Sequence, residues 1–201
     1  MPSKRYDYWL DRAVELFSQG RSWNAGGCCG DATDEKQDDI AFLRRLVDYV
    51  SYDITKHHNF EVDEKRIYVT GISNGGFMAH RVACEMSDII AAAAPVAGPL
   101  SNEEISESDA LSSQPLWRGD MFQSPNKPMW KETISFECGR PVPILYIHNR
   151  QDTIVPYKGS SELHIPSANK TVGKWKEING LQYSQSHQVQ SHKDNTTCEI
   201  H

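Results

Sequence analysis

The segment from Ile67 to Met86 constrains the fold of this chain more than any other part of its sequence. The run Ile67 to Thr70 is β-branched and aromatic, which is typical of a strand, and it ends at Gly71. A helical spacing of apolar residues follows at once, formed by Met78, Ala79, Val82, Ala83 and Met86. The sequence therefore predicts a strand, a tight turn and a helix in direct succession.

The predicted turn, Gly71-Ile72-Ser73-Asn74-Gly75, fits the pattern G-x-S-x-G of a nucleophile elbow. Small residues on both sides let strand and helix approach closely, so that the Ser73 hydroxyl projects outward from a strained turn. The backbone N–H of Asn74 and the positive end of the helix would stabilise an oxyanion. The pattern also arises by chance in glycine-rich turns, but its place between a strand and a helix favours a nucleophilic serine.

Apolar patterns elsewhere in the chain predict further helices and strands. A helical spacing runs through Ile40, Leu43, Val47, Val50 and Ile54, with a start signal at Asp34 and Gln37. The runs Ile89 to Val96 and Val142 to Ile147 are apolar on both faces, as expected for strands of a covered parallel sheet. The fold class predicted is α/β, with a mostly parallel sheet between helices.

Length and charge exclude several classes of protein. With 201 residues the chain has room for one domain of ordinary size. The net charge is −6 and basic residues form no cluster, which argues against nucleic acid as a partner. The longest apolar stretch is far shorter than the run of about 20 residues that a membrane helix needs. The first residues contain no recognisable secretory signal.

A serine nucleophile needs a histidine base and an acid that orients the histidine, and in this fold the chain order is serine, acid, histidine. Asp152 follows the predicted strand ending at Ile147, which would place it at the carboxyl edge of the sheet. Asp152 is therefore the candidate acid, and a turn-capping aspartate is the alternative.

Several motifs together resemble the extracellular polyhydroxybutyrate depolymerase and feruloyl esterase-like α/β-hydrolases. They are Ser22 to Gly30 (SWNAGGCCG), Tyr68 to Glu85 (YVTGISNGGFMAHRVACE), Ala94 to Gly98 (APVAG) and Ile144 to Tyr157. The resemblance implies a partial α/β-hydrolase domain over residues 21–201, with an irregular insertion at about 99–140 and a non-family segment over 1–20. It implies the same roles for Ser73 and Asp152, an ester substrate of small or polymeric kind, no metal or organic cofactor, and an extracellular location.

The sequence departs from this family at both ends. The family's histidine lies in a Gly-Gly-Gly-His context that this chain lacks, so we expect the base beyond the C-terminus. The early strands and the first oxyanion loop are likewise expected outside the sequence. The later histidines, His164, His187, His192 and His201, are formally eligible as the base, but each is better explained as a surface residue.

The remaining histidines and the cysteines suggest structural roles. His80 is expected on the polar side of its helix, and His57 and His58 form no metal motif. The chain has five cysteines and no C-x-x-C pair. If the protein is secreted, as the resemblance implies, Cys28 or Cys29 could bridge to Cys84, and reduced buried thiols are the alternative. Two glycosylation sequons begin at Asn169 and Asn195.

Two classes of function remain after these observations. The first is a serine carboxylic-ester hydrolase that uses Ser73, Asp152 and a histidine. The second is a catalytically inactive α/β-hydrolase remnant that binds a ligand, or a carbohydrate-binding module based on the insertion with Trp117 and Trp130. The sequence leaves the substrate and the oligomeric state open.

Overall fold

A computed structural model of the protein describes residues 22–28, 30–58, 61–100, 138–160, 165–181, 187–190 and 197–200. The secondary structure in chain order comprises α2 (Gly30–Asp34), α3 (Asp39–Asp48), the π-helix η1 (Tyr49–Ile54), α4 (Thr55–His57), β1 (Ile67–Ile72), α5 (Asn74–Glu85), β2 (Ile90–Val96), α7 (Ala168–Ile178), β3 (His187–Gln190) and β4 (Thr197–Ile200). The predicted segments 1–20 and most of 99–140 lie outside the described residues.

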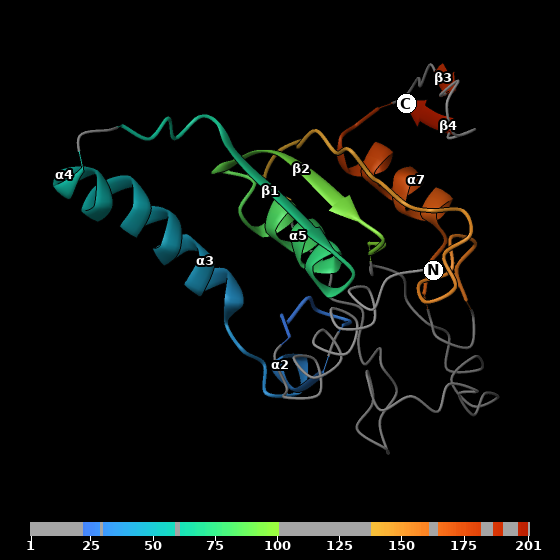
Figure 1. Ribbon diagram of the computed structural model, residues 1–201, viewed down its shortest axis with the longest axis horizontal. Helices are drawn as coiled ribbons and strands as arrows, with labels where there is room; N and C mark the ends of the chain where they lie inside the picture. Colours follow the sequence, from blue (N-terminus) through green and yellow to red (C-terminus); the bar gives the residue numbers. More distant parts are fainter. Residues whose placement is uncertain are drawn as a thin grey trace, which may run out of the picture.

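The centre of the fold is a parallel sheet. Strands β1 and β2 pair in parallel, from Ile67 opposite Ile90 to Ile72 opposite Val96. Residues 142–147, the third strand segment, join the free edge of β2 through parallel bridges of Ala93 with Ile144 and Val96 with Ile147. All three segments run in one direction (Figure 1), so their carboxyl ends meet at one edge.

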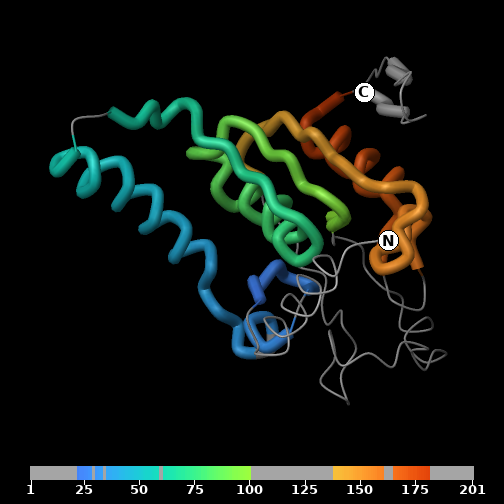
Figure 2. Tube along the Cα trace, in the orientation of Figure 1, coloured from blue at the N-terminus to red at the C-terminus, as the bar shows by residue number. Residues whose placement is uncertain are grey.

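Helix α5 packs on one face of this sheet, with α3 and α7 on either side of it (Figure 2), and all three helices contribute to the core or pack against it. Helix α5 runs behind β1 and β2 and contributes Phe77, Met78 and Val82 to the core. The Arg44 guanidinium of α3 forms a bidentate pair with Asp88 just beyond the end of α5 and donates to the Glu85 carbonyl. Trp175 of α7 donates to His80 of α5. This face of the sheet is therefore covered by α5, to which α3 and α7 are joined by hydrogen bonds.

The opposite face of the sheet presents apolar side chains that the described residues leave exposed. Tyr68, Ile72 and Leu145 each retain more than half of their accessible surface. An open hollow of about 520 Å³ lies on this face between Tyr68, Ala94 and Leu145. The strands carry apolar side chains on both faces, as the sequence predicts. Within the described residues, however, helices pack against only one of these faces.

The helical prediction over Ile40 to Ile54 is confirmed, with two differences. The cap of α3 is Asp38, whose carboxylate accepts from the Ala41 N–H, so the predicted start at Asp34 is wrong. Asp34 instead ends α2. Beyond Asp48 the helix continues as the π-helix η1 and then as α4, which lies at the far tip of this arm (Figure 1). Ile40 is buried, and Leu43 and Val47 pack against the core, as their spacing predicts.

A disulfide joins Cys84, near the end of α5, to Cys138, which lies shortly before the third strand segment. The bridge expected from Cys84 to Cys28 or Cys29 is therefore wrong. The expectation rested on the compartment and on the family resemblance, and it did not weigh Cys138 as a partner. In the fold, the end of α5 lies near residues 138–140, as the hydrogen bond from the Gly139 N–H to Ser87 also shows.

The predicted α/β class is confirmed, with a parallel sheet and helices of the α/β-hydrolase type. The segment β3–β4 adds a small antiparallel pair that is separate from the parallel sheet. Within the described residues, no helix is both long enough and apolar enough to cross a bilayer.

Candidate active site

Ser73 occupies the sharp turn between β1 and α5, with φ 54° and ψ −123°. Positive φ is costly for a residue with a side chain, by about 1–3 kcal/mol, and persists only where the surroundings enforce it. Two sets of backbone hydrogen bonds do so here. The Ser73 N–H donates to the Val96 carbonyl, and the Ser73 carbonyl accepts from Gly76 and Phe77. The strained turn that G-x-S-x-G predicts is therefore present.

Glycines make this turn possible because there is no room for a Cβ atom. A Cβ at Gly71 would overlap the Gly75 carbonyl. A Cβ at Gly76 would lie 2.5 Å from the Val96 carbonyl oxygen, and one at Gly98 would lie 2.6 Å from the Ser73 carbonyl oxygen. The turn is thus held by close backbone packing between β1, α5 and the end of β2.

Asn74 begins α5, and its side chain ties an outer loop to the turn. Its Oδ1 accepts from the Trp23 N–H at 2.7 Å, and its Nδ2 donates to the Trp23 carbonyl at 3.0 Å. The next residue of that loop, Asn24, is held from a second side, because its carbonyl accepts from Arg81. The backbone N–H of Asn74 lies in the first turn of α5, where no carbonyl of the same helix can accept it. It therefore sits where an oxyanion next to Ser73 could be bound.

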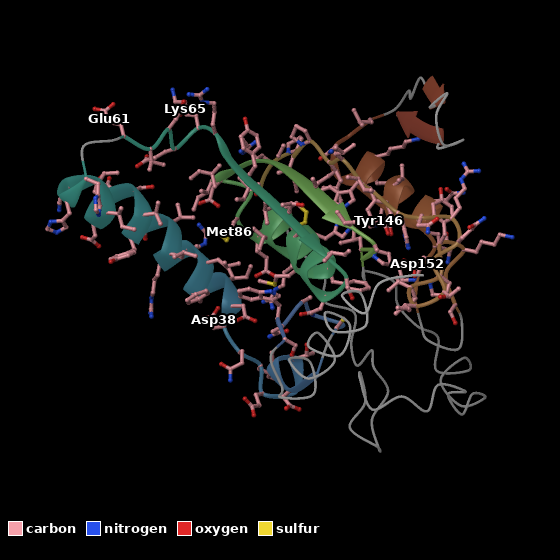
Figure 3. All side chains as sticks on the ribbon, in the orientation of Figure 1. Asp38, Glu61, Lys65, Met86, Tyr146 and Asp152 are labelled. Atoms are coloured by element: carbon pink, nitrogen blue, oxygen red, sulfur yellow. A yellow bond between two sulfur atoms is a disulfide. The ribbon has the colours of Figure 1, made fainter. Side chains whose placement is uncertain are left out.

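Asp152 lies in the loop that follows the third strand segment, and Figure 3 shows it with Tyr146 at the carboxyl end of the sheet. We call residues 148–157 the Asp152 loop. Asp152 Oδ1 accepts from the N–H groups of Ile154 and Val155, both at 2.9 Å. Two interstrand spacings of about 4.8 Å each separate β1 from the third strand segment. The two candidate residues thus follow strand segments that end at the same edge of the sheet.

His148 is a site residue that sequence reasoning missed. Its side chain is almost completely buried, its Nδ1 lies 2.8 Å from the Tyr146 hydroxyl, and its Nε2 lies 2.8 Å from the Val155 carbonyl. The chain order of the triad places the base after the acid, so it points only to histidines beyond Asp152. The available signal is its position directly after a predicted strand and close in sequence to the candidate acid.

His80 differs from its prediction in position, although its interpretation as structural agrees with its contacts. Its side chain is fully buried rather than on a polar face of α5. Nδ1 accepts from Trp175 at 2.8 Å, and the ring lies against Tyr146. Burial lowers the pKa of His80 to about 3, and the nearby backbone of Gly98 offsets a small part of that fall. The residue is therefore neutral in the folded protein.

The described residues do not include a suitable base. His80 and His148 are buried, and their ring nitrogens face inward, whereas His57 and His58 lie at the tip of the helical arm, away from the sheet edge (Figure 1). His164, His192, His201 and the side chain of His187 lie outside the described residues. Within those residues there is also no cluster of three potential metal ligands.

A parallel sheet with a strained serine between strand and helix, and an aspartate after the third strand segment, defines the α/β-hydrolase class. Comparison with known families gives the particular assignment: residues 45–179 match the prolyl oligopeptidase family. The match covers well over half of the sequence, and the chain belongs to this family.

Curated relatives agree with the resemblance inferred from the sequence. Feruloyl esterase B of Piromyces equi is 30% identical over 168 residues, which cover 80% of this chain and 24% of that protein. Poly(3-hydroxyalkanoate) depolymerase C of Paucimonas lemoignei is 33% identical over 89 residues, 41% of this chain and 20% of that protein. The chain thus spans about a quarter or less of the length of these relatives. No solved structure matches it significantly.

Proposed function

We propose that this chain carries the nucleophile and the acid of a serine carboxylic-ester hydrolase. Ser73 would be the nucleophile, Asp152 the acid that orients a histidine, and the Asn74 N–H one donor of the oxyanion hole. The observation that carries the proposal is the backbone of Ser73, whose φ of 54° is held by hydrogen bonds to Val96, Gly76 and Phe77 and made possible by close-packed glycines. Strain of this kind at a partly exposed serine serves catalysis better than it serves stability.

The chemistry proceeds in two balanced steps. Ser73 Oγ attacks the ester carbonyl carbon while the histidine takes the hydroxyl proton, and the Asn74 N–H stabilises the resulting oxyanion. Collapse breaks the bond to the alcohol, which leaves with the proton from the histidine. Water then attacks the acyl-enzyme with the same histidine as base, releasing the acid and restoring Ser73. The reaction consumes only the ester and water.

The substrate class we propose is an ester with an aromatic or polymeric acyl part. The family match alone would equally suit a peptidase, because it is named for prolyl oligopeptidase. The two curated relatives favour an ester, since one is named a feruloyl esterase and the other a poly(3-hydroxyalkanoate) depolymerase. Hydrolysis of ethyl ferulate or of a polyhydroxybutyrate film, with no cleavage of a proline-containing peptide, would support this choice.

We further propose that the protein acts outside the cell. The disulfide between Cys84 and Cys138 supports this location, because such bonds persist mainly in oxidising compartments. Mass spectrometry of protein isolated from its natural source would test it. Recovery of the Cys84 and Cys138 peptides as a linked pair from the culture fluid would agree, and recovery of free thiols from the cytosol would contradict it.

The test of the catalytic proposal is labelling of the purified full-length protein by a fluorophosphonate probe, which reacts only with an activated serine. We expect labelling that is lost in Ser73→Ala. Ser51→Ala is the matched control, because the buried Ser51 hydroxyl has no partner among the described residues and its removal should leave labelling unchanged. A folded wild-type protein that is not labelled would overturn the proposal and favour a non-catalytic, ligand-binding function.

A further inference from the structure

The ring of His148 is bonded at both nitrogens. A carbonyl oxygen can only accept a hydrogen bond, so the Val155 carbonyl, at 2.8 Å, requires a proton on Nε2. In the neutral ring, Nδ1 is then an acceptor and receives the Tyr146 hydroxyl proton, also at 2.8 Å. Burial raises the pKa of Tyr146 well above its usual range, which keeps this donor protonated. The tautomer and orientation of His148 are thus fixed by its neighbours.

The partner of Nε2 belongs to the same turn that holds Asp152. The peptide groups of Val155 are bonded in both directions, because its N–H donates to Asp152 Oδ1 and its carbonyl accepts from His148. The other carboxylate oxygen, Oδ2, lies 3.6 Å from His148 Nε2, beyond hydrogen-bond distance. Oδ1 is therefore used by the backbone of the turn, whereas Oδ2 accepts no hydrogen bond from the described residues.

Aromatic rings close the space around His148 and separate it from water. The ring centroid of Tyr146 lies 5.6 Å away and that of Tyr157 lies 5.5 Å away. The Arg150 guanidinium is placed over the outer part of this cluster, 5.8 Å from the Tyr157 ring. Behind Tyr146 lies the neutral ring of His80. Because both ring nitrogens of His148 have partners and its side chain is almost completely buried, it is not a candidate for the base itself.

We propose that His148 is a positioning residue for Asp152, acting through the Val155 carbonyl to hold the turn that presents Oδ2 at the carboxyl edge of the sheet. This inference rests on the proposed function, in which Asp152 orients the catalytic histidine. Errors of about 1 Å in such a group can cost about a hundredfold in rate, so one hydrogen bond that fixes the turn has a large effect.

Two variants of similar size separate this role from a merely structural one. The amide of His148→Gln reaches the position of Nε2 and can still donate to Val155, whereas the shorter His148→Asn reaches only the position of Nδ1. The rate constant of fluorophosphonate labelling is measured for the full-length protein from about pH 5 to pH 9, together with the melting temperature. We expect His148→Gln to label within about threefold of wild type, and His148→Asn at least tenfold more slowly.

The pH dependence of the labelling rate constant does not change when only the amount of folded protein falls. It therefore distinguishes a positioning role from a loss of folding. A displaced Asp152 stabilises the protonated catalytic histidine less, so the acid limb of the profile for His148→Asn should shift to lower pH. Equal rate constants and equal profiles for both variants, with differences only in the amount labelled, would overturn the inference. Absence of labelling in folded wild-type protein would instead overturn the proposed function, and this inference with it.

Nuclear magnetic resonance of wild-type protein with ¹⁵N-labelled histidine gives a test that does not depend on any variant. The Val155 carbonyl requires a proton on His148 Nε2, and this proton should exchange slowly because the side chain is almost completely buried. An Nε2 without a proton, or a fast-exchanging Nε2 proton, would contradict the inference even if both variants failed to fold.

Discussion

The Ser73 turn and the Asp152 loop lie at the same edge of the sheet, yet they are held in place by different means. The Ser73 turn is fixed by backbone atoms, with glycines at 71, 76 and 98 that leave no space for a side chain. The Asp152 loop is fixed by side chains, chiefly the carboxylate of Asp152 and the ring of His148. We therefore expect the Ser73 turn to be destabilised by substitutions that add side-chain volume at its glycines. We expect the Asp152 loop to be disturbed by substitutions that remove a hydrogen bond or a charge.

The largest effect is expected from Asp152→Asn, which keeps the shape of the loop but removes the charge. The amide oxygen can still accept from Ile154 and Val155, so the loop and its melting temperature should change little. The orienting charge for the catalytic histidine would be lost, and we expect labelling to slow by about a thousandfold or more. The measurement is the fluorophosphonate rate constant at neutral pH. A rate near that of wild type would show that Asp152 is only a turn-capping residue.

The two regions also differ in how far the sequence predicts them. A crowded backbone requires glycine, so the glycines between Gly71 and Gly76 predict the turn at Ser73 from the sequence alone. The partners of Asp152 cannot be predicted from the sequence, because the hydrogen bond of His148 with the Val155 carbonyl depends on how the loop folds back. The same limit explains Cys138, whose approach to Cys84 depends on the path of the chain between residues 98 and 140.

Gly71→Ala should break the backbone-held turn, and Gly75→Ala is its matched control within the same motif. A methyl group at Gly71 overlaps the Gly75 carbonyl, whereas one at Gly75 meets no atom within 4 Å. We expect Gly71→Ala to lower the free energy of unfolding by about 3 kcal/mol or more. Gly75→Ala should be neutral or stabilising by up to about 1 kcal/mol, since alanine favours a helix. Urea denaturation of both variants makes the comparison, and similar losses in the two would contradict it.

His80 belongs to α5, which follows the Ser73 turn, and its ring packs against Tyr146 of the strand segment that leads to the Asp152 loop. It should therefore make the stability of this shared core sensitive to acid. Its pKa is about 3 in the folded protein and about 6.5 when unfolded, so the unfolded chain binds an extra proton between these values. Stability from the neutral ring is present above pH 6.5 and falls by about 1.4 kcal/mol for each pH unit below it.

The measurement for His80 is the free energy of unfolding at pH 7 and at pH 4.5. His80→Asn keeps an acceptor for Trp175 but has no proton to bind, so wild type should lose about 2–3 kcal/mol more than this variant over that interval. The exposed His57→Asn serves as control and should follow wild type. Parallel pH profiles for wild type and His80→Asn would show that burial of this ring does not couple stability to pH.

The smallest effect is expected from Tyr146→Phe, and it tests how much of the Asp152 loop depends on the outer hydrogen bond of His148. The change leaves Nδ1 a buried acceptor without its donor, which should cost about 1 kcal/mol of stability. The bond from Nε2 to Val155 remains, so the labelling rate should fall only a fewfold. A loss as large as that expected for His148→Asn would mean that the hydrogen bond from Tyr146, more than the bond from Nε2 to Val155, holds Asp152 in place.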